Sequence, residues 1–194
     1  MPSLETLAQR ILHSPQALSK LLIGGLLCFI PVLNLFALGY LGRVLTEAQE
    51  SRSVPELPVW DRWGKLFVDG CVLFVIGLVY AGIPLFLGSL LTALLEEILG
   101  HFVGFFAYIP LCIAVAVAVP LAFAAAFQCL GKGSLHSLWD VHYVLQLIRN
   151  HWVVLVAPTC AFWGLQLLGL GVYGLAHFCG LILYGVFVFR IFQE

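Results

Sequence analysis

The stretch that decides the fold contains residues 21–45, which read LLIGGLLCFIPVLNLFALGYLGRVL, and residues 57–70, which read LPVWDRWGKLFVDG. As one helix, the first segment would be roughly 37 Å long and could cross a bilayer. Pro31 interrupts it near its middle, because proline lacks a backbone donor, and Asn34 can satisfy the groups left free at a turn. The segment is therefore either one kinked spanning helix or a re-entrant hairpin with its tip near Pro31 and Asn34.

The composition is typical of a membrane protein. Hydrophobic residues make up 62% of the 194 residues and charged residues 10%, with a mean hydropathy of +1.05. A soluble domain has about 45–50% apolar and about 25% charged residues. We predict a single all-α membrane domain over residues 1–194, with the lipid bilayer as a partner. The net charge of -1 gives no reason to expect nucleic acid as a partner. Four further apolar spans follow the broken segment, at about residues 66–91, 102–129, 152–170 and 172–191.

The distribution of the nine basic residues favours the hairpin. Residues 92–101 and 170–172 contain no Lys or Arg, and basic loops favour the cytoplasmic side of a membrane. If residues 21–45 form a hairpin, all nine basic residues lie on one side, whereas a spanning helix would move Arg10 and Lys20 to the other. We therefore predict a polytopic bundle with a re-entrant hairpin, four spanning helices, and both termini and the basic loops in the cytoplasm. Five spanning helices are the alternative.

An aromatic and basic cluster precedes the first of these four spans. Trp60, Arg62, Trp63 and Lys65 have the composition of an interfacial anchor, in which the rings lie at headgroup level and the cations point toward phosphates. Asp69 follows one turn into the next helix. A carboxylate near a helix N-terminus is ordinary, but Asp69 could also bind an ion or a lipid headgroup, so it is a candidate polar site.

Residues 134–149 have the pattern of an amphipathic helix. Their apolar residues recur at helical spacing, and too few of them are consecutive to span a bilayer. We expect this helix to lie on the cytoplasmic membrane surface. The residues on its apolar face are Leu138, Val141, Val144, Leu145 and Ile148.

The second span carries a ridge of small residues. Such a ridge lets two transmembrane helices approach closely, either inside one chain or between subunits, and the sequence does not separate these alternatives. The ridge consists of alanines at every fourth position: Ala114, Ala118, Ala122 and Ala126.

His177 is the ionisable side chain that lies furthest inside a predicted span. Ionisable groups within a membrane are functional candidates by default, so His177 is a second candidate polar site. The alternative is a neutral histidine that bonds to a neighbouring helix, with Gln128 and Gln166 as candidate partners.

The segment around residues 39–70 also carries a recognisable pattern. It combines a GYxxR element with an LPxWxxW…FxxG element, and with both the chain resembles an uncharacterised family of small prokaryotic multi-pass membrane proteins known only by a domain-of-unknown-function label. The resemblance implies a prokaryotic source, and hence the prokaryotic cytoplasmic membrane. It implies no activity, cofactor or catalytic residue. The matching residues are Gly39, Tyr40, Arg43, Leu57, Pro58, Trp60, Trp63, Phe67 and Gly70.

The sequence carries no signature of an enzyme. The spans hold no paired carboxylates, HExxH motif, Ser/His/Asp set or Gly-rich phosphate loop. We therefore predict no catalytic, cofactor-binding or metal-binding residues. Our first hypothesis is a small homo-oligomeric membrane protein that gives a passive path, or a lipid-facing groove, to an ion, lipid or small solute. The second is a non-transporting scaffold or accessory subunit of a larger membrane complex.

Overall fold

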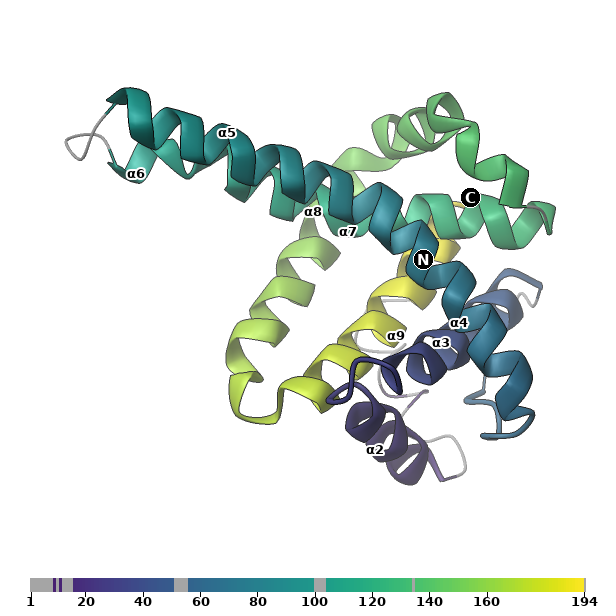
Figure 1. Cartoon of the computed structure of the whole chain (residues 1–194). Coiled ribbons are helices and arrows are strands. Elements are labelled where there is room, and N and C mark those ends of the chain that lie inside the picture. Colours follow the sequence, from purple (N-terminus) through teal and green to yellow (C-terminus); the bar gives the residue numbers. More distant parts are fainter. Residues whose placement is uncertain are drawn as a thin grey trace.

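The computed structural model describes residues 9, 11, 16–50, 56–99, 104–133 and 135–193 (Figure 1). The secondary structure of these residues is entirely helical. The chain is therefore an all-α polytopic membrane protein, as its composition predicts. Four helices are long and apolar enough to cross a membrane, close to the predicted spans: Trp63–Ile98, Phe105–Lys132, Val141–Leu168 and Leu170–Ile191.

The helix break expected at Pro31 is present. Helix α2 (Ala17–Leu27) and helix α3 (Asn34–Glu50) are separated by a turn over residues 28–33. They have 11 and 17 residues, or about 16 and 26 Å, so each is shorter than the roughly 30 Å hydrocarbon core. The single helix over residues 21–45 that five spans would require is therefore not formed in the described structure.

The next helical segment is a long, bent rod. Helix α4 (Trp63–Gly77) continues through a π-helical segment, η1 (Leu78–Gly82), into helix α5 (Ile83–Leu99). Pro84 has no N–H to donate to the carbonyl of Tyr80, and wide π turns and kinks are common next to such a missing bond. Figure 1 shows the rod changing direction between α4 and α5.

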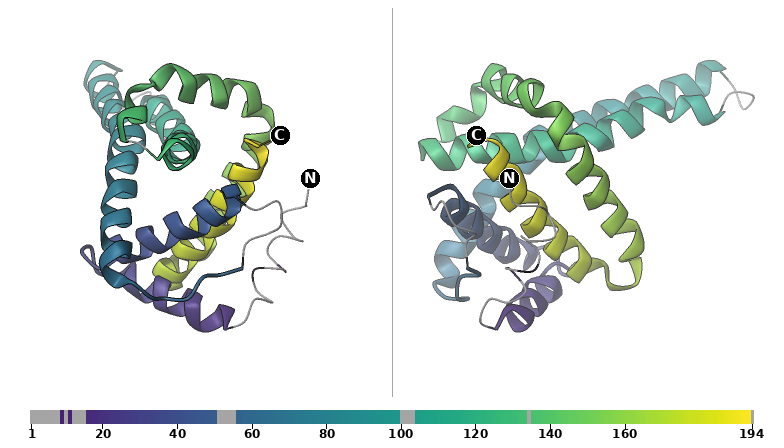
Figure 2. Two further views of the ribbon diagram at one scale, coloured as in Figure 1. Left: turned by 90° about the vertical axis from the view of Figure 1, so that its right-hand side faces the viewer. Right: turned by 180° about the vertical axis from the view of Figure 1, so that it is seen from behind.

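Helix α5 pairs with the first half of helix α7 (Ile109–Lys132), after the short helix α6 (Gly104–Ala107). The two lie side by side and project from the rest of the molecule as an arm (Figures 1 and 2). Gly88 of α5 lies directly against Ala114 of α7, where an added Cβ would collide with the alanine. The outer faces of the arm are apolar, and Phe105 is 83% exposed, as expected of helices that contact lipid.

The amphipathic segment does not form a helix of its own, so this part of the prediction is wrong. A 3₁₀ turn, η3 (Leu135–Trp139), leads to helix α8 (Val141–Leu168), which continues from the amphipathic residues into the third span. The reason is that no glycine or proline occurs between Val141 and Pro158 to end the helix. Instead, α8 bends along its length (Figure 2), as helices with an internal proline do.

Helix α9 (Tyr173–Ile191) follows the 3₁₀ turn η4 (Leu170–Val172) and lies at the centre of the molecule. It packs against α2, α3 and α8. Several of its side chains, such as Ile182, Val186 and Phe189, are fully buried. On the N-terminal half of α9, Gly24 of α2 lies against Phe178, so the first and last described helices of the chain are in contact.

Helices α3 and α4 cross at two glycines. A Cβ atom on Gly39 would collide with the carbonyl oxygen of Leu66, and one on Gly70 would collide with that of Leu35. Each backbone therefore occupies the space that a side chain of the other helix would need. Such close approach at small residues is typical of helix pairs in membranes.

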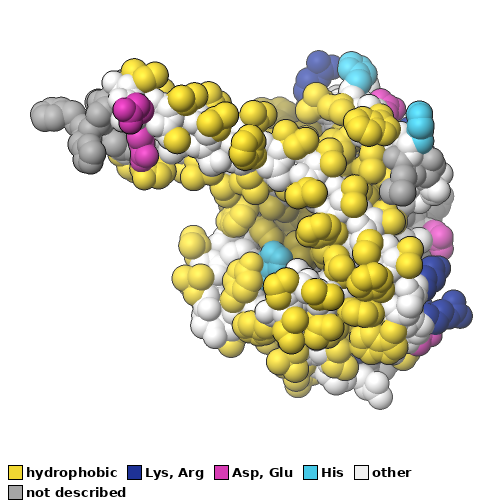
Figure 3. Space-filling model, viewed as in Figure 1, with side chains coloured by type: hydrophobic (Ala, Val, Ile, Leu, Met, Phe, Trp, Pro, Cys, Tyr) yellow, Lys and Arg dark blue, Asp and Glu magenta, His cyan; other side chains and the backbone are white. Residues whose placement is uncertain are grey.

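Charged side chains are unevenly distributed over the molecule. In the view of Figure 3, the lysine and arginine side chains lie on the side away from the arm. The arm carries an acidic pair, Glu96 and Glu97, in the last turns of α5. Arg10 and Arg52 lie outside the described residues.

We predict that Gly70→Ala lowers the thermal unfolding midpoint in detergent. The added methyl group must push α3 and α4 apart, and overpacking of this kind costs about 1–3 kcal/mol. Gly64→Ala is the matched control on the same helix, because a Cβ there meets no atom within 4 Å. An equal midpoint for Gly70→Ala and the wild type would show that the crossing is looser than described.

Candidate functional site

The loop of residues 57–61 is held by side chains of α2 and α3. Three side chains donate hydrogen bonds to three successive loop carbonyls, and the Trp60 indole donates in return to the Lys20 carbonyl at 3.1 Å. Because these carbonyls face the donors, the loop lies against α2 and α3, and the chain then continues into α4. The bonds run from Lys20 Nζ to the Leu57 oxygen (2.5 Å), from the Tyr40 hydroxyl to the Pro58 oxygen (2.8 Å) and from Arg43 to the Val59 oxygen (3.0 Å).

Aromatic rings complete this attachment. Trp60 stacks on Tyr40 with ring centroids 4.1 Å apart, and it also stacks on Trp63 at 5.6 Å. Phe178 of α9 lies 6.2 Å from Trp60, so the stack also reaches the central helix. Tyr40 is fully buried. The residues of the GYxxR and LPxWxxW elements therefore meet in one place, where they fix α3, the loop and α4 to one another.

The structure places the four residues of the predicted interfacial anchor differently. Trp60, which we expected at headgroup level, is half-buried and stacks on Tyr40 and Trp63. Trp63 is 46% exposed, and Arg62 and Lys65 are exposed. Their role as an interfacial anchor stays a prediction.

Asp69 lines a polar groove between α3 and α4. The groove has a volume of about 250 Å³ and is lined by Arg43, Thr46 and Glu47 of α3, Lys65 and Asp69 of α4, and Leu130 near the end of α7. Asp69 is half-buried. Two basic and two acidic side chains thus face one space, a combination that the sequence analysis did not anticipate.

Arg43 links this groove to the loop. Its guanidinium donates to the carboxylate of Asp61 as well as to the Val59 carbonyl. The hydrogen bond and the charge of Arg43 hold the pKa of the Asp61 carboxyl below its ordinary value. Arg43 is therefore fixed at the rim of the groove by the same loop that it holds.

His177 lines a second, apolar groove. This groove has a volume of about 260 Å³ and lies between α3, α4, α7 and α9. Its lining includes Leu38 and Leu41 of α3, Leu73 and Gly77 of α4, Ala122 and Phe123 of α7, and His177 and Leu181 of α9. Figure 3 shows a histidine side chain in the hollow between the arm and the rest of the molecule.

The imidazole of His177 stacks on Tyr173 at 5.4 Å and lies 6.4 Å from the ring of Phe162. Neither of the glutamines considered as its partners bonds to it. The side-chain amides of Gln128 and Gln166 are buried and have no hydrogen-bond partner among the described residues. Among the described residues that line the apolar groove, His177 has the polar side chain.

The alanine ridge packs inside the chain. Ala114, Ala118 and Ala126 are buried, and Ala122 lines the apolar groove. The ridge thus contributes to contacts of α7 within the chain, and its part in a subunit interface stays untested.

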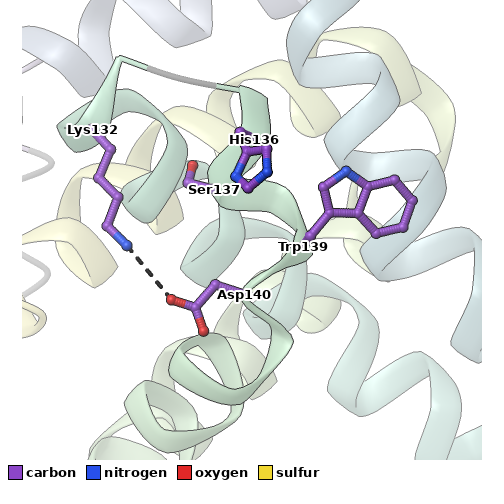
Figure 4. Close-up of a pocket in the computed structure, with 5 residues that line it drawn as sticks. All are labelled: Lys132, His136, Ser137, Trp139 and Asp140. Atoms are coloured by element: carbon purple, nitrogen blue, oxygen red, sulfur yellow. Dashed lines mark ion pairs between the residues drawn. The ribbon is translucent and has the colours of Figure 1, made fainter.

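A second polar surface lies where α7 ends and η3 begins (Figure 4). Lys132 Nζ lies 3.6 Å from the Asp140 carboxylate and 5.2 Å from the centre of the Tyr143 ring. Both members of the ion pair are about half exposed, and such pairs contribute little stability. Asp140 also accepts from the backbone N–H of Tyr143 at 3.3 Å, so the cluster caps the start of α8. Within the described ranges, no three His, Cys, Asp or Glu side chains could hold a metal ion.

Comparison with known proteins gives one match. A family model described as a protein of unknown function (DUF4013) matches residues 23–184. The search of curated proteins found no significant match, and neither did the search of solved structures.

We predict that two substitutions at Tyr40 weaken the loop attachment to different degrees. Tyr40→Phe removes only the bond to Pro58, at a cost of about 0.5–1.5 kcal/mol. Tyr40→Leu also removes the stack on Trp60, worth about 0.5–1.5 kcal/mol more. Denaturant unfolding in detergent measures both, with Tyr143→Phe as the control. Equal stabilities of the two Tyr40 variants would contradict a contribution from stacking.

We predict that the stabilising effect of Asp61 disappears at low pH. A lowered pKa favours the ionised carboxylate in the folded state, so the stabilisation is complete above the ordinary pKa of about 3.8 and is lost as the pH falls through the lower folded-state value. The thermal midpoint of the wild type should exceed that of Asp61→Asn at neutral pH, and the two should converge in acid. A constant difference would mean that the carboxylate charge is not responsible.

Proposed function

The chain belongs to the DUF4013 family, whose function is unknown, and from this premise we propose that it is a lipid-binding protein of a prokaryotic cytoplasmic membrane. It is not an enzyme. It holds the apolar chain of a lipid in the apolar groove and gives that lipid a passive, protein-lined position within the bilayer.

The observation that carries this proposal is the lining of the apolar groove. It combines side chains of four helices, and His177 is the polar member of an otherwise apolar set. Water does not fill an apolar space stably, and side chains that line an empty space lose dispersion contacts. A hydrocarbon chain from the surrounding bilayer supplies those contacts. His177 then offers one hydrogen-bonding group to the bound molecule.

The α2–α3 hairpin re-enters the membrane from the cytoplasmic side in this proposal. Its turn exposes apolar side chains, including Phe29, Ile30 and Val32. Backbone groups in lipid must be satisfied internally, and the N–H groups of Phe29, Ile30 and Asn34 all donate to nearby carbonyls. Lys65, Lys132 and the chain termini then face the cytoplasm.

The arm favours a second candidate function, that of a scaffold or accessory subunit. Its exposed apolar faces on α5 and α7 could contact another membrane protein or a second copy of the chain as readily as lipid. In that case the protein would form a homo-oligomer or part of a larger complex, and its apolar groove would have no ligand.

We predict that Gly77→Phe blocks the apolar groove. Gly77 lines the groove, and a Cβ there meets no atom within 4 Å, so the new ring can enter the space without moving the backbone. The probe is a phospholipid with a photoreactive group on its acyl chain, incorporated with the protein into liposomes. Label on the peptide that contains Leu181 should fall several-fold, whereas label on the exposed Phe86 should not change.

Gly164→Phe is the matched control. Gly164 is another glycine of a spanning helix with open space around it, but it does not line the groove. If Gly77→Phe and Gly164→Phe label like the wild type at Leu181, no acyl chain occupies the groove. The scaffold function would then be the better account.

A further inference from the structure

We infer that the ligand is a phospholipid whose headgroup carries both a phosphate and a primary ammonium, and that the polar groove binds this headgroup. The inference rests on the proposed function, since it names the class of lipid whose chain occupies the apolar groove. It depends on the relative position of the two grooves and on the charges that line the polar one.

The two grooves adjoin each other between α3 and α4. Leu73 lines both of them. Along α7, the polar groove reaches Leu130, near the charged end of the helix at Lys132, whereas the apolar groove lies deeper, from Val119 to Ala126. Leu130 and Val119 are separated by about 16 Å along the helix axis. A lipid placed here would have its headgroup at the end of the helix and its chain farther into the membrane.

The polar groove presents opposite charges on both of its helices. Arg43 and Glu47 lie one turn apart on α3, and Lys65 and Asp69 lie one turn apart on α4. In the part of the chain that the structure describes, neither the Lys65 ammonium nor the Asp69 carboxylate has a hydrogen-bond or ion-pair partner. A guanidinium has five N–H donors, so Arg43 retains donors beyond those that it gives to the loop.

This set of charges fits a zwitterion better than an anion. A phosphate can lie between Lys65 and Arg43, because both side chains bind phosphate oxygens. An anionic headgroup would place a like charge next to the Asp69 carboxylate. An ammonium group beside the phosphate would instead be attracted to that carboxylate. A quaternary ammonium is typically held by aromatic rings, and none of the described residues that line this groove is aromatic. A primary ammonium, in contrast, can donate hydrogen bonds to a carboxylate.

Native mass spectrometry of the delipidated full chain in a mild detergent tests the inference. Phosphatidylethanolamine, phosphatidylcholine and phosphatidylglycerol with identical acyl chains would be titrated separately. The wild type should bind phosphatidylethanolamine at least about threefold more tightly than the other two, the scale of a solvent-accessible ion pair. Asp69→Asn should remove the preference over phosphatidylglycerol. Lys65→Gln should weaken the binding of all three lipids.

Two controls match these substitutions. Asp140→Asn and Arg62→Gln remove exposed charges outside the polar groove and should leave the preference unchanged. Soluble phosphoethanolamine separates a lipid headgroup from a free ligand of the same chemistry, and it should not compete at lipid-like concentrations. Competition at those concentrations would overturn the assignment to a lipid.

The remaining outcomes separate this inference from the proposed function. The wild type could bind the three lipids equally, and Gly77→Phe could lose this binding. That result would overturn the headgroup assignment and leave the apolar groove as a lipid site. An unchanged preference in Asp69→Asn would do the same. If the wild type binds each of the three lipids no more strongly than Gly77→Phe does, both the headgroup assignment and the proposed function are overturned.

Discussion

The structure depends on the contact between the backbones of α3 and α4 at Gly39 and Gly70. No side chain separates the helices there, so their relative position is fixed by backbone atoms, which cannot adjust by changing rotamer. Tyr40 follows Gly39 directly, and one residue of an α-helix turns through about 100°. The glycine therefore faces α4 while the tyrosine faces the loop and α9. Both grooves lie beside this crossing, since α3 and α4 contribute to each.

This geometry gives the motif residues a structural meaning. Tyr40 and Arg43 donate hydrogen bonds to main-chain carbonyls of the 57–61 loop, and the ring of Tyr40 stacks on that of Trp60. Such groups leave few atoms for a ligand. Apart from the remaining N–H donors of Arg43, the groups available to a ligand lie next to the motif, at Lys65 and Asp69 on one side and at His177 on the other. The motif positions the grooves, and the neighbouring residues determine what the grooves can hold.

The sequence was sufficient for the features that depend on local chemistry. Hydropathy located the four spans, and Pro31 located the break between α2 and α3. It was insufficient where distant segments meet. The bond from Lys20 to the Leu57 carbonyl joins residues 37 positions apart, and the apolar groove combines four helices, so neither leaves a periodic pattern. The separate helix expected before α8 was wrong for a local reason: amphipathicity describes which face is apolar, but not where a helix ends. Asp69 and His177 were identified individually, yet nothing in the sequence indicated that two adjoining spaces would contain them.

The contact between α2 and α9 has a consequence for the order in which the protein can assemble. Gly24 packs on Phe178, so α2 obtains this partner only after the chain has been synthesised as far as α9. Until then α2 can contact α3 and, through Lys20, the loop of residues 57–61. Helix α3 can pack on α4 once both have been synthesised, whereas α2 can dock on α9 only after α9 has been synthesised. A ribosome that stalls before residue 178 would leave α2 without this contact.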